Sequence, residues 1–298
     1  MSKRIFVIGA GAVGAYTGGH LARAGADVTF VDPWAEHVEK MRDDGLELKG
    51  MSEEECFKLK VKAMTPDEFK AVTAERPVDI GIISTKAYDT EWAAELVKPA
   101  LADDGYVISL QNCINEDRIA AIIGAERTAG CIASTISVGL DAAAFVKRNV
   151  PKRGASYTVF RCGELSGEAS SRIEDMVEWL GHVDSAKMTT NLMGERWSKL
   201  TINASGNGLS ACTGYDTKSM ALEDAPRRIQ VYPMLTTALV LVCVAHTPHG
   251  AVVAFEEHAP LQPHAEHSVL VKSRRRTCPV HRAQQLWCGS CISSVATL

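Results

Sequence analysis

The first 32 residues contain the feature that most constrains the fold, a glycine-rich turn between two short β-rich segments. An apolar run over 4–8 leads into the turn Gly9-Ala10-Gly11-Ala12-Val13-Gly14, which has the spacing G-x-G-x-x-G. A helical pattern follows, and a second β-rich run over 28–31 ends on the acid Asp32. This order of strand, turn, helix, strand and acid predicts the first βαβ unit of a Rossmann-type sheet.

Each glycine of the turn has its own expected task. Gly9 allows the tight bend, Gly11 lets the backbone approach a pyrophosphate, and Gly14 lets the helix pack closely on the strand. The start of the helix presents free N–H groups and the positive end of its dipole to the phosphates. Asp32 is placed to accept hydrogen bonds from an adenosine ribose. The sequence therefore predicts a dinucleotide bound by residues 9–14 and Asp32.

Length, charge and cysteine usage narrow the class of protein. The 298 residues are enough for two domains. A net charge of −4 offers no footprint for nucleic acid, and the apolar run over 238–245 is too short to span a membrane. The nine cysteines are scattered, mostly in apolar stretches, which favours reduced thiols in a cytoplasmic protein over a disulfide framework.

Strand and helix patterns alternate over residues 1–125. Expected strands after the glycine turn lie at 46–48, 57–61, 78–84 and 106–110, with helices at 33–44, 67–74 and 89–101. Further strands are expected at 128–138 and 156–162, followed by a helix at 169–180. This rhythm predicts an α/β fold with a parallel, doubly wound sheet.

A long helical pattern over 193–210 marks a change of architecture. We therefore expect a dinucleotide-binding Rossmann domain over 1–189 and a smaller all-α substrate domain over 190–298. The composition of 232–298 is atypical, because Glu256, Glu257 and Glu266 are the only acids in the last 73 residues. Our hypothesis is that this tail is translated from another reading frame, which would leave the helical domain incomplete or altered at its C-terminal end.

Two short cysteine and histidine pairs lie in the tail. Cys278-x-x-His281 and Cys288-x-x-Cys291 resemble a set of four zinc ligands. The gap between the pairs is short for a zinc finger or ribbon, and the stretch is rich in both residue types. We therefore expect a chance arrangement and no metal.

Two polar residues directly follow expected parallel strands. Lys86 comes after the strand at 78–84, and Asn112 comes after the strand at 106–110. Ligands of open α/β sheets bind beyond the carboxyl ends of such strands. Lys86 and Asn112 are therefore candidates to contact the cofactor or the substrate, and the alternative is a solvated lysine and a turn asparagine.

A second group of polar residues lies on the long helical pattern. Lys199, Asn203 and Asn207 recur every four residues and so share one face of the helix. Such a row usually faces solvent, but here apolar residues flank it. Gly206 and Gly208 have no side chains, so another molecule could approach the helix closely at these positions. A lysine and two carboxamides suit a small, oxygen-rich substrate.

Four motifs together resemble the ketopantoate reductase family (2-dehydropantoate 2-reductases). They are Ile5 to Gly14, Thr85-Lys86-Ala87-Tyr88-Asp89-Thr90, Leu110-Gln111-Asn112 and Trp197-Ser198-Lys199-Leu200-x-x-Asn203-x-x-x-Asn207. The resemblance covers about residues 3–230 in the expected order. It implies a Rossmann domain for the nicotinamide cofactor and a helical domain that closes the cleft and often forms a homodimer.

The resemblance also implies a role for each candidate residue. Lys199 would be the general acid, Asn203 and Asn207 would hold the substrate, and Asn112 and Lys86 would line the cleft. The implied reaction is hydride transfer to the keto group of a 2-oxo acid, most simply 2-dehydropantoate in pantothenate biosynthesis.

Three departures from the family pattern leave alternatives open. Asp32 stands where NADPH-using members usually carry a phosphate-tolerant residue, so the sequence favours NAD(H) over the family's common NADP(H). Cys113 follows Asn112 where glycine is usual, and the family's late serine and glutamate have no counterpart in the tail. The alternatives are an NADH-dependent reductase of another branched 2-oxo acid, another two-domain Rossmann dehydrogenase, and a catalytically impaired dinucleotide-binding protein.

Overall fold

The computed structural model of the chain describes residues 3–72 and 76–232. The chain divides into two compact units, Met1–Trp197 and Ser198–Leu298. The boundary falls inside the long helix α7 (Leu192–Thr213). The division into domains over 1–189 and 190–298 remains a prediction.

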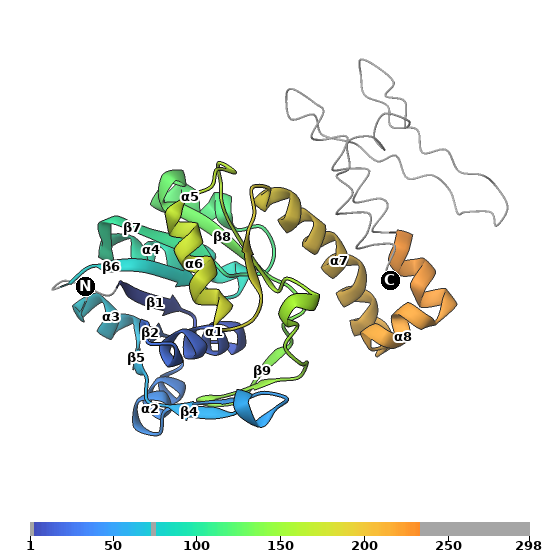
Figure 1. The fold of residues 1–298 in the computed structure, drawn as a ribbon, viewed down its shortest axis with the longest axis horizontal. Helices are drawn as coiled ribbons and strands as arrows, with labels where there is room; N and C mark the ends of the chain where they lie inside the picture. The colour runs from blue at the N-terminus through green and yellow to red at the C-terminus, as the bar shows by residue number, and fades with distance from the viewer. Residues whose placement is uncertain (1–2, 73–75, 233–298) are drawn as a thin grey trace, which may run out of the picture. The chain divides into compact units, whose positions relative to one another are not determined.

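The first unit is built on an eight-stranded sheet with the order β12-β11-β8-β7-β6-β1-β2-β5 (Figure 1). Neighbouring strands are parallel at every pairing except that of β8 with β11, which is antiparallel. The strands are β1 (Arg4–Ile8), β2 (Asp27–Val31), β5 (Lys62–Met64), β6 (Val78–Ile83), β7 (Leu101–Ser109), β8 (Thr128–Ala133), β11 (Phe160–Glu164) and β12 (Ala186–Met188). The expected α/β fold with a predominantly parallel sheet is confirmed.

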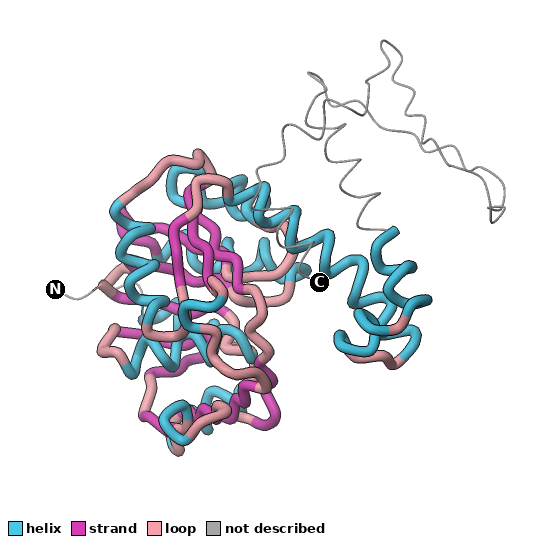
Figure 2. The backbone as a smooth tube through the Cα atoms, turned by 45° about the vertical axis from the view of Figure 1, so that its right-hand side comes forward, coloured by secondary structure: helices cyan, strands magenta, loops and turns pink. Residues whose placement is uncertain are grey.

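Helices cover both faces of this sheet, as a doubly wound fold requires (Figure 2). They are α1 (Ala12–Arg23), α2 (Ala35–Asp43), α3 (Pro66–Val72), α4 (Thr90–Val97), α5 (Glu116–Ile123) and α6 (Ser171–Gly181). Ile5 and Val7 of β1 belong to one buried apolar cluster together with residues of α1 and α6. Phe6 and Ile8 belong to a second cluster, with residues of α3, α4 and α5. The alternation along β1 therefore separates two cores.

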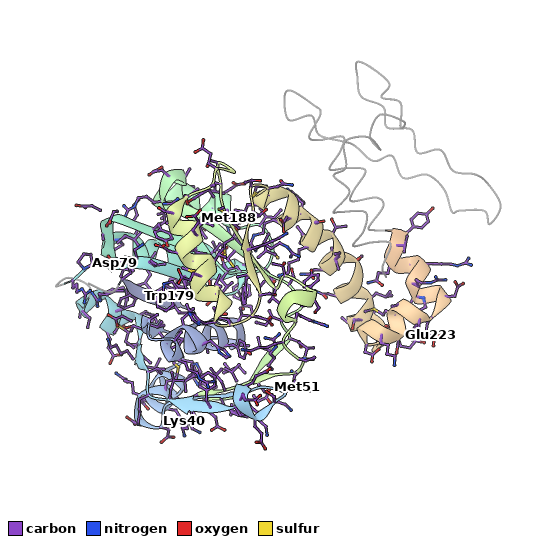
Figure 3. All side chains as sticks on the ribbon, in the orientation of Figure 1. Lys40, Met51, Asp79, Trp179, Met188 and Glu223 are labelled. Carbon is purple, nitrogen blue, oxygen red and sulfur yellow. The ribbon has the colours of Figure 1, made fainter. Side chains whose placement is uncertain are left out.

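Partly buried side chains extend the first of these cores toward the sheet edge. Trp179 of α6 and Met188 of β12, both labelled in Figure 3, pack against it. At the amino ends of β1 and β6, a carboxylate oxygen of Asp79, which is also labelled in Figure 3, accepts the backbone N–H of Arg4 at 2.7 Å. The labelled residues thus mark the edge of the sheet and the amino ends of β1 and β6.

A second, four-stranded sheet with the order β4-β3-β10-β9 was not predicted from the sequence. It contains β3 (Leu46–Lys49), β4 (Phe57–Leu59), β9 (Val138–Ala142) and β10 (Phe145–Arg148). The expected single strand over 128–138 is wrong, because Thr135 has a φ of 56° and the chain leaves the main sheet there. The expected strand over 57–61 is likewise shortened to β4, and the next segment, β5, joins the main sheet instead.

Two further element boundaries differ from expectation for local reasons. The helix expected over 89–101 ends at Val97, and a short 3₁₀ turn with Pro99 near its start leads directly into β7. The strand expected over 156–162 begins later, at Phe160, because 154–156 forms a 3₁₀ turn.

The described part of the second unit is helical. After α7 come α8 (Thr217–Leu222) and a helix over 224–232. The Asp216 side chain accepts the backbone N–H of Ser219 at 2.7 Å and so caps α8. A Cβ atom on Gly206 would lie 3.2 Å from Nε2 of Gln230, so α7 and the helix over 224–232 lie side by side at this glycine. The proposed frame change and the zinc-like pattern lie outside the described residues.

A buried polar cluster joins β10 of the second sheet to the segment between α6 and β12. The guanidinium of Arg148 donates to the carboxylate of Asp184 at 2.5 Å, and both side chains are fully buried. Burial alone would raise the pKa of Asp184, but the N–H of Ser185 and the guanidinium of Arg148 outweigh it and lower that pKa. Burial, with help from Lys152 and Arg23, lowers the pKa of the neighbouring His20 to about 3.

His20 therefore makes folding sensitive to acid. Below a pH of about 6.5 the unfolded chain protonates this histidine while the folded chain does not, so stability falls as the pH falls. We predict that His20→Leu removes up to about 1.4 kcal/mol per pH unit from the slope of the unfolding free energy between about pH 6 and 4. Urea unfolding of both proteins across this range checks it, and an identical slope in the variant would contradict it.

Candidate functional site

The glycine turn between β1 and α1 has a geometry that few side chains would tolerate. Gly9 has a φ of 91°, and its backbone N–H donates to the carbonyl oxygen of Val31 at 2.8 Å. A Cβ atom on Gly14 would lie 2.2 Å from both the carbonyl oxygen of Gly9 and Oγ of Ser84. A Cβ atom on Gly11 would meet nothing within 4 Å. The turn is therefore tightly packed at both ends and open at Gly11.

Asp32, at the end of β2, holds the turn from the side. Its Oδ2 accepts the backbone N–H of Ala10 at 2.7 Å, and its Oδ1 accepts the backbone N–H of Trp34 at 2.9 Å. A carboxylate offers about four lone-pair positions, so this arrangement leaves about two of them for another donor. Asp32 thus both shapes the turn and retains capacity to bind a ligand hydroxyl.

The first turn of α1 offers backbone donors beside the opening at Gly11. The helix begins at Ala12, and its N-cap Gly11 provides no side-chain hydrogen bond. The first N–H groups of a helix have no partner within the helix and attract anions. Ala12, Val13 and Gly14 can therefore offer N–H groups to phosphate oxygens, which is the fit that a dinucleotide needs at this turn.

Gln111, after β7, ties together the two loops that carry Lys86 and Asn112. Its side-chain Nε2 donates to the carbonyl oxygen of Thr85 at 3.1 Å and to Oγ1 of Thr90 at 2.9 Å. Lys86 is exposed just beyond β6, and Asn112 is exposed just beyond β7. Both candidates therefore lie at the carboxyl ends of neighbouring parallel strands, as expected.

The loop after Asn112 departs from the geometry that most residues adopt. Cys113 is exposed and has a φ of 70°, in the left-handed region that glycine enters freely. The side chain of Asn115 closes the loop, because its Nδ2 donates to the carbonyl oxygen of Asn112 at 2.7 Å. The cysteine thus occupies a position where glycine would be less strained.

Arg196 fixes the first turn of α7 to the end of β7. Its Nη2 donates to the carbonyl oxygen of Ser109 at 2.9 Å, and its Nε donates to Oε1 of Glu116 at 2.8 Å. Its Nη1 donates to the carbonyl oxygen of Gln111 at 2.5 Å. Arg196 and Glu116 are almost completely buried. Sequence reasoning missed this pair, because the two residues are far apart in the chain and neither belongs to a recognisable motif.

The three helical candidates lie further along α7, in the second unit. Lys199, Asn203 and Asn207 share one face of the helix, and Lys199 comes one turn after Arg196. Lys199 and Asn203 are half-buried, whereas Asn207 is exposed. This face presents one cationic donor and two carboxamides, a set that can bind and protonate an oxygen-rich molecule.

Comparison with models of protein families shows which family this chain belongs to. The model described as ketopantoate reductase PanE/ApbA matches residues 5–154, which include the glycine turn, Lys86 and Asn112. The chain belongs to the ketopantoate reductase family. The name of this family is that of an oxidoreductase.

Individual ketopantoate reductases with curated names match at moderate identity. The 2-dehydropantoate 2-reductase of Pyrococcus horikoshii is 29% identical over 227 residues, which cover 74% of this chain and 67% of the relative. That of Archaeoglobus fulgidus is 31% identical over 215 residues, which cover 70% of this chain and 64% of the relative. The matches thus span about two thirds of each relative.

Solved structures share the fold. The 2-dehydropantoate 2-reductase of Geobacter metallireducens GS-15 aligns with a TM-score of 0.69 at 25% identity, covering 84% of this chain and 78% of that one. A D-mandelate dehydrogenase solved with NADH and anilino(oxo)acetate aligns with a TM-score of 0.68 at 22% identity, covering 80% and 74%. The second likeness establishes the fold alone.

Two negative findings hold for residues 3–72 and 76–232. None of the helices there combines the length and apolar character that a membrane crossing needs. Within the same ranges, no three His, Cys, Asp or Glu side chains are grouped so that they would hold a metal ion.

The buried pair of Arg196 and Glu116 gives a direct test of how α7 is anchored. We predict that Arg196→Met destabilises the protein by about 3–5 kcal/mol, because it leaves the Glu116 carboxylate buried and unpaired. The double variant with Glu116→Leu should recover much of this loss.

Urea unfolding of the single and double variants measures these changes. Arg227→Met is the control, because Arg227 is more than half exposed in its ion pair with Asp224, and we expect no measurable change. Equal stability of Arg196→Met and the wild type would show that the pair does not anchor the helix.

Proposed function

We propose that this protein reduces the keto group of a 2-oxo acid with NADH, and that the substrate is 2-dehydropantoate. The observation that carries the proposal is the glycine turn, open at Gly11 and held by Asp32, in a chain of the ketopantoate reductase family. The matched relatives are named for this reaction. An NADH-dependent reductase of another branched 2-oxo acid is the second candidate, favoured by the departure at Asp32.

The cofactor preference follows from the surroundings of Asp32. Its carboxylate can accept hydrogen bonds from a free ribose hydroxyl but repels a 2′-phosphate. The segment after β2 reads Pro33-Trp34-Ala35-Glu36-His37 and contains no lysine or arginine to neutralise such a phosphate. The lack of a lysine or arginine in this segment supports NADH over NADPH.

The candidate residues have separate proposed roles in cofactor binding, substrate binding and proton transfer. The bound nicotinamide supplies the hydride for the keto carbon. The turn residues 9–14 and Asp32 would hold the diphosphate and the adenosine ribose. Lys86 and Asn112, exposed at the carboxyl ends of β6 and β7, would contact the cofactor or the substrate. Nζ of Lys199 donates a proton to the substrate's keto oxygen, so that an alcohol forms, and Asn203 and Asn207 orient the substrate through their amide groups.

The arrangement of the whole chain belongs to the same proposal. Residues 1–189 bind the dinucleotide and residues 190–298 supply the substrate side. A catalytically impaired protein that still binds the dinucleotide remains the alternative from another class, because the family's late serine and glutamate have no counterpart after residue 232. Turnover with a 2-oxo acid separates the two.

Asp32 is predicted to set the ratio between the two cofactors. We expect the wild type to have a KM for NADH at least about tenfold below that for NADPH, since like charges in contact cost several kcal/mol. Asp32→Asn keeps the size of the side chain and removes the charge, but its amide can accept only one of the two backbone N–H groups that Asp32 accepts. Both KM values should therefore rise, while the ratio between them falls by about tenfold.

Steady-state kinetics with both cofactors measures this ratio. Asp27→Asn on the same strand is the control, because Asp27 pairs with exposed Lys62 at 2.6 Å, away from the turn. A wild type that prefers NADPH, or an Asp32→Asn ratio equal to that of the wild type, would contradict the assignment.

Lys199 is predicted to act in proton transfer rather than in cofactor binding. Lys199→Ala should lose about 100-fold or more in kcat with 2-dehydropantoate, in the range typical for removal of a general acid, while its affinity for NADH stays unchanged. Oxidation of NADH with a panel of 2-oxo acids and direct NADH titration measure the two effects. Near-normal turnover of the variant would refute the role, and absence of turnover in the wild type would favour the impaired protein.

A further inference from the structure

His37, on α2, uses both ring nitrogens in the fully buried space beside the glycine turn. Its Nδ1 accepts the backbone N–H of Ala144 at 2.8 Å, and its Nε2 lies 2.9 Å from the carbonyl oxygen of Ala10. A backbone N–H can only donate and a carbonyl oxygen can only accept. The ring must therefore carry its proton on Nε2 and donate it to Ala10.

The hydrogen bond from His37 fixes more than the carbonyl group of Ala10. Because the peptide unit is planar and trans, the carbonyl of Ala10 and the N–H of Gly11 point in opposite directions. Holding the carbonyl against His37 therefore directs the N–H of Gly11 away from the protein core. Gly11 is also the position of the turn where an added Cβ would meet nothing within 4 Å, so there is room for a ligand beside this peptide.

The other side of the same residue is held independently. The backbone N–H of Ala10 donates to Oδ2 of Asp32 at 2.7 Å. Asp32 and His37 thus hold the two polar groups of Ala10, one from the end of β2 and one from α2. Neither peptide unit that flanks Ala10 can rotate without loss of a hydrogen bond.

His37 is itself held by the turn between β9 and β10 and by an aromatic neighbour. Ala144 has a φ of 57°, and its carbonyl oxygen accepts the backbone N–H of Glu47 at 2.8 Å, which ties it to β3. The indole of Trp34 stacks on the imidazole, with ring centres 5.2 Å apart and planes 13° apart. The orientation of the imidazole is therefore fixed by a hydrogen bond from the second sheet and by stacking of the Trp34 indole on its ring.

We propose that His37 is a positioning residue of the dinucleotide site, which orients the Ala10–Gly11 peptide so that its N–H meets the cofactor diphosphate. His37 does not touch the ligand itself and acts only through Ala10. The inference rests on the proposed function, because it requires that the turn binds a nicotinamide dinucleotide. It also gives the four-stranded sheet a role, because β3 and the β9–β10 turn hold His37, and His37 in turn holds the glycine turn.

Two substitutions separate the two hydrogen bonds of His37. Gln places an amide N–H near the position of Nε2 and can keep the bond to Ala10, while it loses the bond to Ala144. Asn places an amide oxygen near the position of Nδ1 and can keep the bond to Ala144, while it loses the bond to Ala10. Each variant loses one hydrogen bond, so a purely structural role predicts similar losses of thermal stability and equal effects on binding.

The test is fluorescence titration of NADH onto the full-length wild type, His37→Gln and His37→Asn, with thermal unfolding of each. His182→Asn is the control, because His182 is an exposed histidine at the end of α6. We expect His37→Asn to weaken NADH binding by about tenfold, the value of one hydrogen bond, and His37→Gln to stay within about threefold of the wild type.

The outcomes distinguish this inference from the proposed function. If the wild type binds NADH and the two His37 variants bind it equally well or equally poorly, the positioning role is overturned and the proposed function stands. If the wild type binds neither NADH nor NADPH, the proposed function and the inference fall together. Weaker binding by His37→Asn alone, at similar melting temperatures of the two variants, supports the inference.

Discussion

The hydrogen bond from the Ala10 N–H to the Asp32 carboxylate is the constraint on which the rest of the glycine turn depends. It joins the glycine turn to the end of β2 and fixes how α1 leaves the sheet. Gly9 and Gly14 then allow backbone and helix to approach each other more closely than any Cβ would permit. The acid that the sequence suggested as a ribose ligand is thus first a structural element of the turn.

A second anchor, at the end of β7, holds the start of α7. Arg196 donates to two carbonyl groups of that strand end and to the buried Glu116, so the start of α7 is fixed to the same edge of the sheet that carries Asn112. Leaving either charge unpaired in this position costs several kcal/mol. The residues of α7 that belong to the first unit are therefore held by buried hydrogen bonds to the end of β7 and to Glu116.

The order of elements and the glycine turn could be predicted because their signals are local, in the period of apolar residues and the spacing of glycines. The four-stranded sheet could not, because β3 and β10 pair across about a hundred residues and a left-handed Thr135 breaks what looks like one strand. For the same reason His37, Arg196 and Glu116 escaped notice. Their roles arise from buried hydrogen bonds to distant backbone groups, which leave no spacing pattern in the sequence.

We have proposed that residues 9–14 and Asp32 hold a nicotinamide dinucleotide, and a crystal structure of the protein grown with NADH is the decisive experiment. We expect the diphosphate against the backbone N–H groups of Gly11 to Gly14, with the adenosine ribose hydroxyls on Asp32 and the Ala10 carbonyl still bonded to His37. A cofactor bound elsewhere, or a turn that rearranges so that Ala10 leaves Asp32 and His37, would contradict it.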